Sequence, residues 1–136
     1  QTNKVKFAVK LFDYIHSVDS LKLAKKISDE SLKLNKKIKI FVQVNIGQEV
    51  QKSGIDKDDL DNLISFCKNL NLELVGLMCI PPLNLDPLIY FKQMSKLNKH
   101  YGFIDLSMGM SSDYLVAAEN SATYLRIGSS IFGERS

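Results

Sequence analysis

Apolar side chains recur along the chain with two alternating periods, one typical of helices and one typical of strands. Val5, Ala8 and Val9 lie at helical spacing behind Asn3, a residue type that caps helices. Short apolar runs predict strands over 14–18, 38–46, 72–80, 103–108 and 123–128. The run over 38–46 is almost continuously apolar, which suits a strand buried on both faces.

Helical segments separate the expected strands, and most of them begin with a capping residue or an acidic turn. The expected start signals are Asp19 or Ser20, Asp58-Asp59, Asp86-Pro87, and Ser111 or Ser112. The expected inner face of the second helix is Leu21, Ala24, Ile27 and Ser31, and that of the third is Leu60, Leu63, Ile64 and Cys67.

This regular alternation predicts an α/β fold with a parallel sheet covered by helices. Two architectures fit the pattern. A doubly wound open sheet is complete with five strands, whereas a (βα)₈ barrel of the TIM type needs eight. A barrel would therefore require three more βα units before Gln1, and the pattern alone does not choose between the two.

Composition narrows the class of protein. With 136 residues, 45% hydrophobic and 24% charged, residues 1–136 are expected to form a single domain around one core. A formal charge of +3 is too mild to indicate nucleic-acid binding. The apolar runs are too short to cross a membrane, and no signal-peptide pattern opens the chain, so the expected location is cytoplasmic.

Cysteine and histidine give no metal signature. Cys67 and Cys79 lack the close spacing of a zinc site and are expected to be buried free thiols. His16 and His100 are isolated in the sequence, so no metal is expected. The charge run Lys36-Lys37 is expected to be a solvated helix end.

Two strand ends carry the residues most suited to binding a ligand. The segments over 106–113 and 126–133 run from apolar strands into glycine and serine turns that open helices. Exposed backbone amides, serine hydroxyls and a helix dipole suit such turns to a phosphate, and the last two strands of a barrel usually form its phosphate site. Alternatively, glycine and serine are simply good turn and cap residues.

Arg126 stands between Leu125 and Ile127 on a strand that otherwise looks interior. A buried guanidinium needs a partner. The partner is either a carboxylate such as Asp105 or a ligand beside Gly128, because strand alternation places Arg126 and Gly128 on one face.

Short segments along the whole chain resemble the YggS/PROSC family in the family's order. They are Gln-Thr-Asn-Lys at residue 1, His-Ser-Val-Asp at 16, Gln-Val-Asn-Ile at 43, Lys-Ser-Gly-Ile at 52, Gly-Leu-Met at 76, Leu-Ser-Met-Gly-Met-Ser at 106 and Arg-Ile-Gly-Ser at 126. The resemblance implies a barrel similar to the N-terminal domain of alanine racemase, of which this chain would be strands four to eight.

The same resemblance implies that the protein holds pyridoxal 5′-phosphate (PLP) as a Schiff base. The residues implied in cofactor binding are Ser107, Gly109, Met110, Ser111, Arg126, Ile127, Gly128 and Ser129. Of these, Ser111, Gly128 and Ser129 would meet the phosphate, and Arg126 would face the pyridine nitrogen. No residue is expected to be catalytic.

The chain departs from the family pattern at its beginning. The family's Schiff-base lysine lies on the first strand, in an Ala-Val-Ser-Lys-like sequence that is absent here, and Lys52 is the best substitute among the lysines. The expected function is PLP homeostasis without turnover. The alternatives are a racemase-like PLP enzyme, a barrel for another phosphorylated metabolite, or an inert remnant. An exposed sheet edge at 14–18 is expected to favour self-association.

Overall fold

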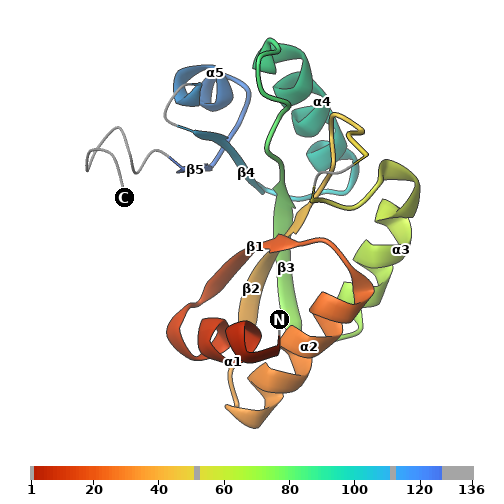
Figure 1. Ribbon diagram of the computed structural model, residues 1–136, viewed down its shortest axis with the longest axis vertical. Helices are drawn as coiled ribbons and strands as arrows, with labels where there is room; N and C mark the ends of the chain where they lie inside the picture. The colour runs from red at the N-terminus through yellow and green to blue at the C-terminus, as the bar shows by residue number, and fades with distance from the viewer. Residues whose placement is uncertain (1, 51–52, 111–112, 127–136) are drawn as a thin grey trace.

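The computed structural model describes residues 2–50, 53–110 and 113–126, in which helices and strands alternate (Figure 1). The helices are α1 (Thr2–Leu11), α2 (Leu21–Lys33), α3 (Lys57–Lys68), α4 (Pro87–His100) and α5 (Tyr114–Glu119). The strands are β1 (Tyr14–Val18), β2 (Ile38–Gln43), β3 (Leu72–Met78), β4 (Asp105–Met110) and β5 (Tyr124–Arg126). The predicted alternation is therefore confirmed over these ranges.

The strands form one sheet in the order β1-β2-β3-β4-β5, and every neighbouring pair is parallel. Because crossovers between parallel strands are right-handed, a strand order that follows the sequence puts successive helices on the same side of the sheet. Helices α2, α3, α4 and α5 follow one another around the outside of the sheet in Figure 1. A doubly wound sheet instead reverses its strand order, so that architecture is excluded.

Contacts across the concave side show that the sheet is curled. Strands β1 and β5 are separated by three strands, so in a flat sheet they would lie roughly 19 Å apart. The ring centroids of Tyr14 on β1 and Tyr124 on β5 are only 5.5 Å apart. The predicted partial barrel is thus confirmed as a curled parallel half-barrel.

Alternation along the strands divides the core into two layers. On β2, Ile38, Ile40 and Val42 join the main apolar core, to which the helices contribute, whereas Phe41 joins aromatic rings on the concave side. The predicted inner face of α3 is buried throughout. On α2, however, Leu21 is 39% exposed, because it is the first residue of the helix and precedes the turn that carries buried Ala24.

Helix starts were predicted with mixed success. Ser20 caps α2 by accepting a hydrogen bond from the Leu23 amide at 3.1 Å, and Asp86 caps α4 by accepting one from the Leu88 amide at 3.0 Å. The Asn3 cap is wrong, because α1 already begins at Thr2. Asp113 occupies the N-cap position of α5, so that helix begins later than Ser111 or Ser112 would have placed it.

Strand boundaries also shift by a few residues. The third strand stops at Met78, and the fourth covers Asp105–Met110, beginning and ending two residues later than predicted. Gly102, at a φ of +76°, and the hydrogen bond from Asn98 to the Phe103 carbonyl hold residues 102–103 in the preceding turn. The predicted strand residues after Arg126 lie outside the described ranges.

Lys36 is not the solvated helix end that was expected. Its ammonium group donates hydrogen bonds to the carbonyl oxygens of Val9 and Phe12, both at 2.9 Å, and lies 3.5 Å from the Asp13 carboxylate. The last carbonyls of a helix lack partners within the helix and carry partial negative charge. Lys36 therefore caps the carboxyl end of α1.

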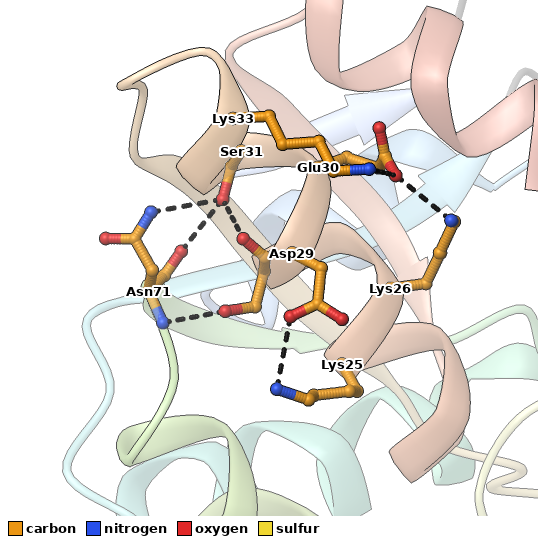
Figure 2. A network of polar contacts seen from close by, with 8 residues as sticks. Lys25, Lys26, Asp29, Glu30, Ser31, Lys33 and Asn71 are labelled. Carbon is orange, nitrogen blue, oxygen red and sulfur yellow. Dashed lines mark hydrogen bonds and ion pairs between the residues drawn. The ribbon is translucent and has the colours of Figure 1, made fainter.

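A polar network joins the carboxyl end of α2 to the turn before β3 (Figure 2). The side-chain nitrogen of Asn71 donates to the hydroxyl oxygen of Ser31 at 3.1 Å and to the carbonyl oxygen of Lys36 at 3.0 Å. The backbone N–H of Asn71 donates to the hydroxyl oxygen of Ser28 at 3.0 Å. Ser28 and Ser31 are buried, so these bonds satisfy polar groups that would otherwise be costly.

Glu30 lies beside this network and pairs with two lysines of α2 (Figure 2). Its carboxylate is 3.0 Å from the ammonium of Lys26 and 3.2 Å from that of Lys33. The hydrogen bond with Lys26 is the main cause that holds the pKa of Glu30 below its usual value. Glu30 is therefore held as a carboxylate on a helix, where its role is structural.

Candidate functional site at the carboxyl ends of β4 and β5

The carboxyl ends of β4 and β5 lie side by side, as predicted. Ser107 pairs with Tyr124, and Met110 pairs with Arg126. Thr123 fastens the two strands where β5 begins: its hydroxyl accepts from the Leu106 amide at 2.7 Å and its amide donates to the Leu106 carbonyl at 2.8 Å. The two strands therefore end at the same edge of the sheet.

Gly109 ends the buried part of β4 in a conformation that suits glycine. Its φ is +96°, which residues with a Cβ rarely adopt. It is buried and stands one residue before the strand end. A glycine here lets β4 adopt this left-handed backbone conformation without strain.

Only some of the predicted site residues lie in the part of the chain that the structure describes. Ser107 and Gly109 are described in full, whereas Met110 and Arg126 are described as strand residues only. Ser111, Ile127, Gly128 and Ser129 lie outside the described ranges. The sheet register sets the Arg126 backbone opposite Met110, which is five residues beyond Asp105.

Sequence reasoning missed His16. Its Nδ1 lies 2.8 Å from the hydroxyl oxygen of Ser107, a residue 91 positions later in the chain. Its ring packs 4.3 Å from that of Phe41 and 5.5 Å, edge to face, from that of Tyr124. The sequence suggested that His16 is isolated, but in the structure it joins β1 to β4 across the concave side.

Tyr124 lies in this aromatic group and is hard to ionise. A hydrogen bond with the Tyr14 side chain, followed by burial and the negative charge of Asp105, raises the pKa of Tyr124 to about 12. The phenol is therefore neutral at neutral pH. It acts on the concave side as an aromatic surface and a hydrogen-bonding group.

Asn98 on α4 supports the site from the outside. Its side-chain oxygen accepts from the Leu77 amide at 3.0 Å, and its amide nitrogen donates to the Asp105 carbonyl at 2.9 Å. It is 4% exposed. Because β3 and β4 pair over few residues, this side chain completes the hydrogen bonding between them.

Both cysteines are buried, as predicted, and Cys67 is a free thiol. Burial raises the pKa of the Cys67 thiol to about 11, so this thiol is unreactive at neutral pH. Within residues 2–50, 53–110 and 113–126, no cluster of three histidine, cysteine or acidic side chains is placed to hold a metal ion. No helix in the same ranges is long and apolar enough to cross a membrane.

Comparison with known proteins identifies the family. The sequence model of the family described as "Alanine racemase, N-terminal domain" matches residues 1–136. The chain belongs to this family. Among family relatives, a protein of Aquifex aeolicus named "Pyridoxal phosphate homeostasis protein" is 38% identical over 145 residues, which cover 99% of this chain and 64% of the relative. A Vibrio cholerae protein of the same name is 38% identical over 144 residues, covering 99% of this chain and 61% of the relative.

A solved structure of the family agrees with these sequence matches. The structure of PipY from Synechococcus elongatus PCC7942 with PLP bound is 33% identical, with a TM-score of 0.85, and the match covers 93% of this chain and 64% of PipY. The predicted resemblance to PLP homeostasis proteins is therefore confirmed. The chain spans less than two thirds of the length of these relatives.

Proposed function

We propose that this chain forms strands four to eight of a PLP-binding barrel whose role is PLP homeostasis. The observation that carries the proposal is the match over 99% of the chain to proteins named for PLP homeostasis. Similarity to PipY, which was solved with PLP bound, supports it. The proposal treats residues 1–136 as a single, incomplete barrel domain.

The described part of the site fits a phosphate group. Gly109, which is buried and has a positive φ, stands near the end of β4, and the end of β5 lies beside it. Backbone amides beside a glycine can approach an anion closely. In the proposed site Ser111, Gly128 and Ser129 hold the phosphate, while Ser107, Gly109, Met110 and Ile127 shape the turns around it.

Arg126 is proposed to face the pyridine nitrogen of the cofactor. When bound, PLP supplies an electron sink for amino-acid chemistry. The pKa of an arginine is so high that it keeps its proton at neutral pH and does not transfer it to the pyridine nitrogen. The unprotonated ring beside Arg126 is therefore a weak electron sink. This is the reason for proposing a protein that holds and releases PLP without turning over a substrate. We also infer a cytoplasmic location, with which the free, buried thiol of Cys67 agrees.

The phosphate site is tested by Gly128→Val. A valine side chain blocks close approach of an anion to the backbone, so we expect the Kd for inorganic phosphate to rise by about ten-fold or more, the loss expected for one hydrogen bond to a charged group. Calorimetric titration with phosphate, PLP and pyridoxal separates the phosphate contribution from that of the ring. The control is Ser65→Val, because Ser65 is exposed on α3, outside the proposed site. Equal affinities in the two variants would remove this site from the proposal.

We further propose that the chain self-associates through β1. In the described ranges β1 pairs with β2 alone, and Phe7, Leu11 and Phe12 of the preceding segment are 64%, 69% and 57% exposed. Free strand edges and exposed apolar side chains favour pairing with another molecule.

Ser17→Lys tests this association, since Ser17 is exposed on β1 and a lysine on an edge strand opposes strand pairing. We expect sedimentation velocity to show a smaller dimer fraction for Ser17→Lys at every concentration. Ser65→Lys on the exposed face of α3 is the matched control and should behave as the unmodified chain. A monomer at all concentrations in the unmodified chain rules out association through β1.

A further inference from the structure

We propose that His16 is a positioning residue for the phosphate end of the barrel, acting through Ser107. The inference rests on the proposed PLP function and adds to it a residue from the opposite edge of the half-barrel. The observation that carries it is the 2.8 Å contact between Nδ1 of His16 on β1 and the hydroxyl of Ser107 on β4.

Ser107 is well placed to pass on such a constraint. It is fully buried, it pairs with Tyr124 of β5, and it lies two residues before Gly109, where φ is +96°. A hydrogen bond to its side chain fixes the rotation and height of β4 just before the turn that is proposed to meet the phosphate. Neighbouring β3 and β5 are already fixed to β4 by backbone pairing, so His16 adds a constraint from across the concave side.

The His16 ring is itself held in place. Phe41, which is fully buried, packs against the ring with centroids 4.3 Å apart, and Tyr124 meets it edge to face at 5.5 Å. Aromatic packing limits ring rotation, so Nδ1 stays directed at the serine at little entropic cost. A hydrogen bond between two pre-oriented groups is the kind that positions a binding site.

Three variants separate the hydrogen bond from the packing. His16→Phe keeps an aromatic ring and removes the bond, Ser107→Ala removes the other partner, and His16→Asn keeps a polar atom near the place of Nδ1. The matched control is His100→Phe at the exposed end of α4, because His16 and His100 are the two histidines of the chain.

The experiment titrates inorganic phosphate and PLP into each folded variant, and urea denaturation monitors stability. We expect His16→Phe and Ser107→Ala each to weaken phosphate binding by about five-fold, as for the loss of one buried hydrogen bond. The double variant should be no weaker than either single variant, because both remove the same bond. His16→Asn should recover most of the affinity, which a merely destabilised fold would not do, and His100→Phe should bind normally.

Two results overturn the inference in distinguishable ways. If the unmodified chain binds neither phosphate nor PLP, the proposed function fails and the positioning role fails with it. If the unmodified chain binds phosphate and His16→Phe binds equally well, or the effects of His16→Phe and Ser107→Ala simply add, the proposed function stands and His16 has no positioning role.

Discussion

Gly76→Ala is expected to destabilise the fold by about 3 kcal/mol or more, at the upper end of what overpacking costs. A Cβ on Gly76 would overlap the carbonyl oxygen of Asp105, lie 2.7 Å from its carbonyl carbon and lie 3.3 Å from Cε2 of Phe41. The obstacle is the backbone of a paired strand, which cannot move aside as a flexible side chain can. Urea denaturation followed by circular dichroism measures the loss.

The control for this prediction is Gly102→Ala. Gly102 has a φ of +76°, so alanine there is strained, but nothing lies within 4 Å of the added Cβ. We expect a cost of about 1 kcal/mol from the left-handed backbone alone. If Gly76→Ala lowers the free energy of unfolding no more than Gly102→Ala does, β3 and β4 are not closely packed at this point.

The second large effect concerns covalent attachment of the cofactor. We expect no single lysine of this chain to form a stoichiometric bond with PLP that borohydride makes permanent. Attachment needs an unprotonated amine, and desolvation inside a barrel is what lowers a lysine pKa toward neutrality. The ammonium groups of Lys26, Lys33 and Lys36 instead bind carboxylates and helix carbonyls.

The same chain extended by three amino-terminal βα units of the family is expected to form one such bond. Replacing the lysine of the family's first strand by alanine should abolish it. Mass spectrometry of the reduced, digested proteins locates the modified residue. One clean adduct on the unextended chain, at Lys52 or elsewhere, would show that the anchor of the cofactor has been misplaced.

Local features of the fold were predictable because they depend on neighbours in the sequence. Apolar periodicity located each element, and Ser20 and Asp86 cap the helices that follow them. Alternation along β2 also separates Phe41 from its helix-facing neighbours. The ends of the strands were predicted less accurately, because the end of a strand such as β3 depends on how far the neighbouring strand continues.

The long-range polar contacts could not be predicted from the same patterns. The partner of His16 is 91 residues away and comes within reach only because the sheet curls. Asn98 looks like an ordinary polar residue near a helix end, yet it is buried and binds backbone groups of both β3 and β4. Each of these contacts depends on the three-dimensional path of the chain, for which the sequence offers no local signal.

The capping of α1 by Lys36 has a consequence for the order of events during synthesis. The carbonyl groups that Lys36 binds belong to residues made 27 and 24 positions earlier. We therefore expect these carbonyl groups to be solvated by water alone while the chain leaves the ribosome. The carboxyl end of α1 is expected to become fixed only after α2 and the residues before β2 have emerged, and to be open to proteases and chaperones until then.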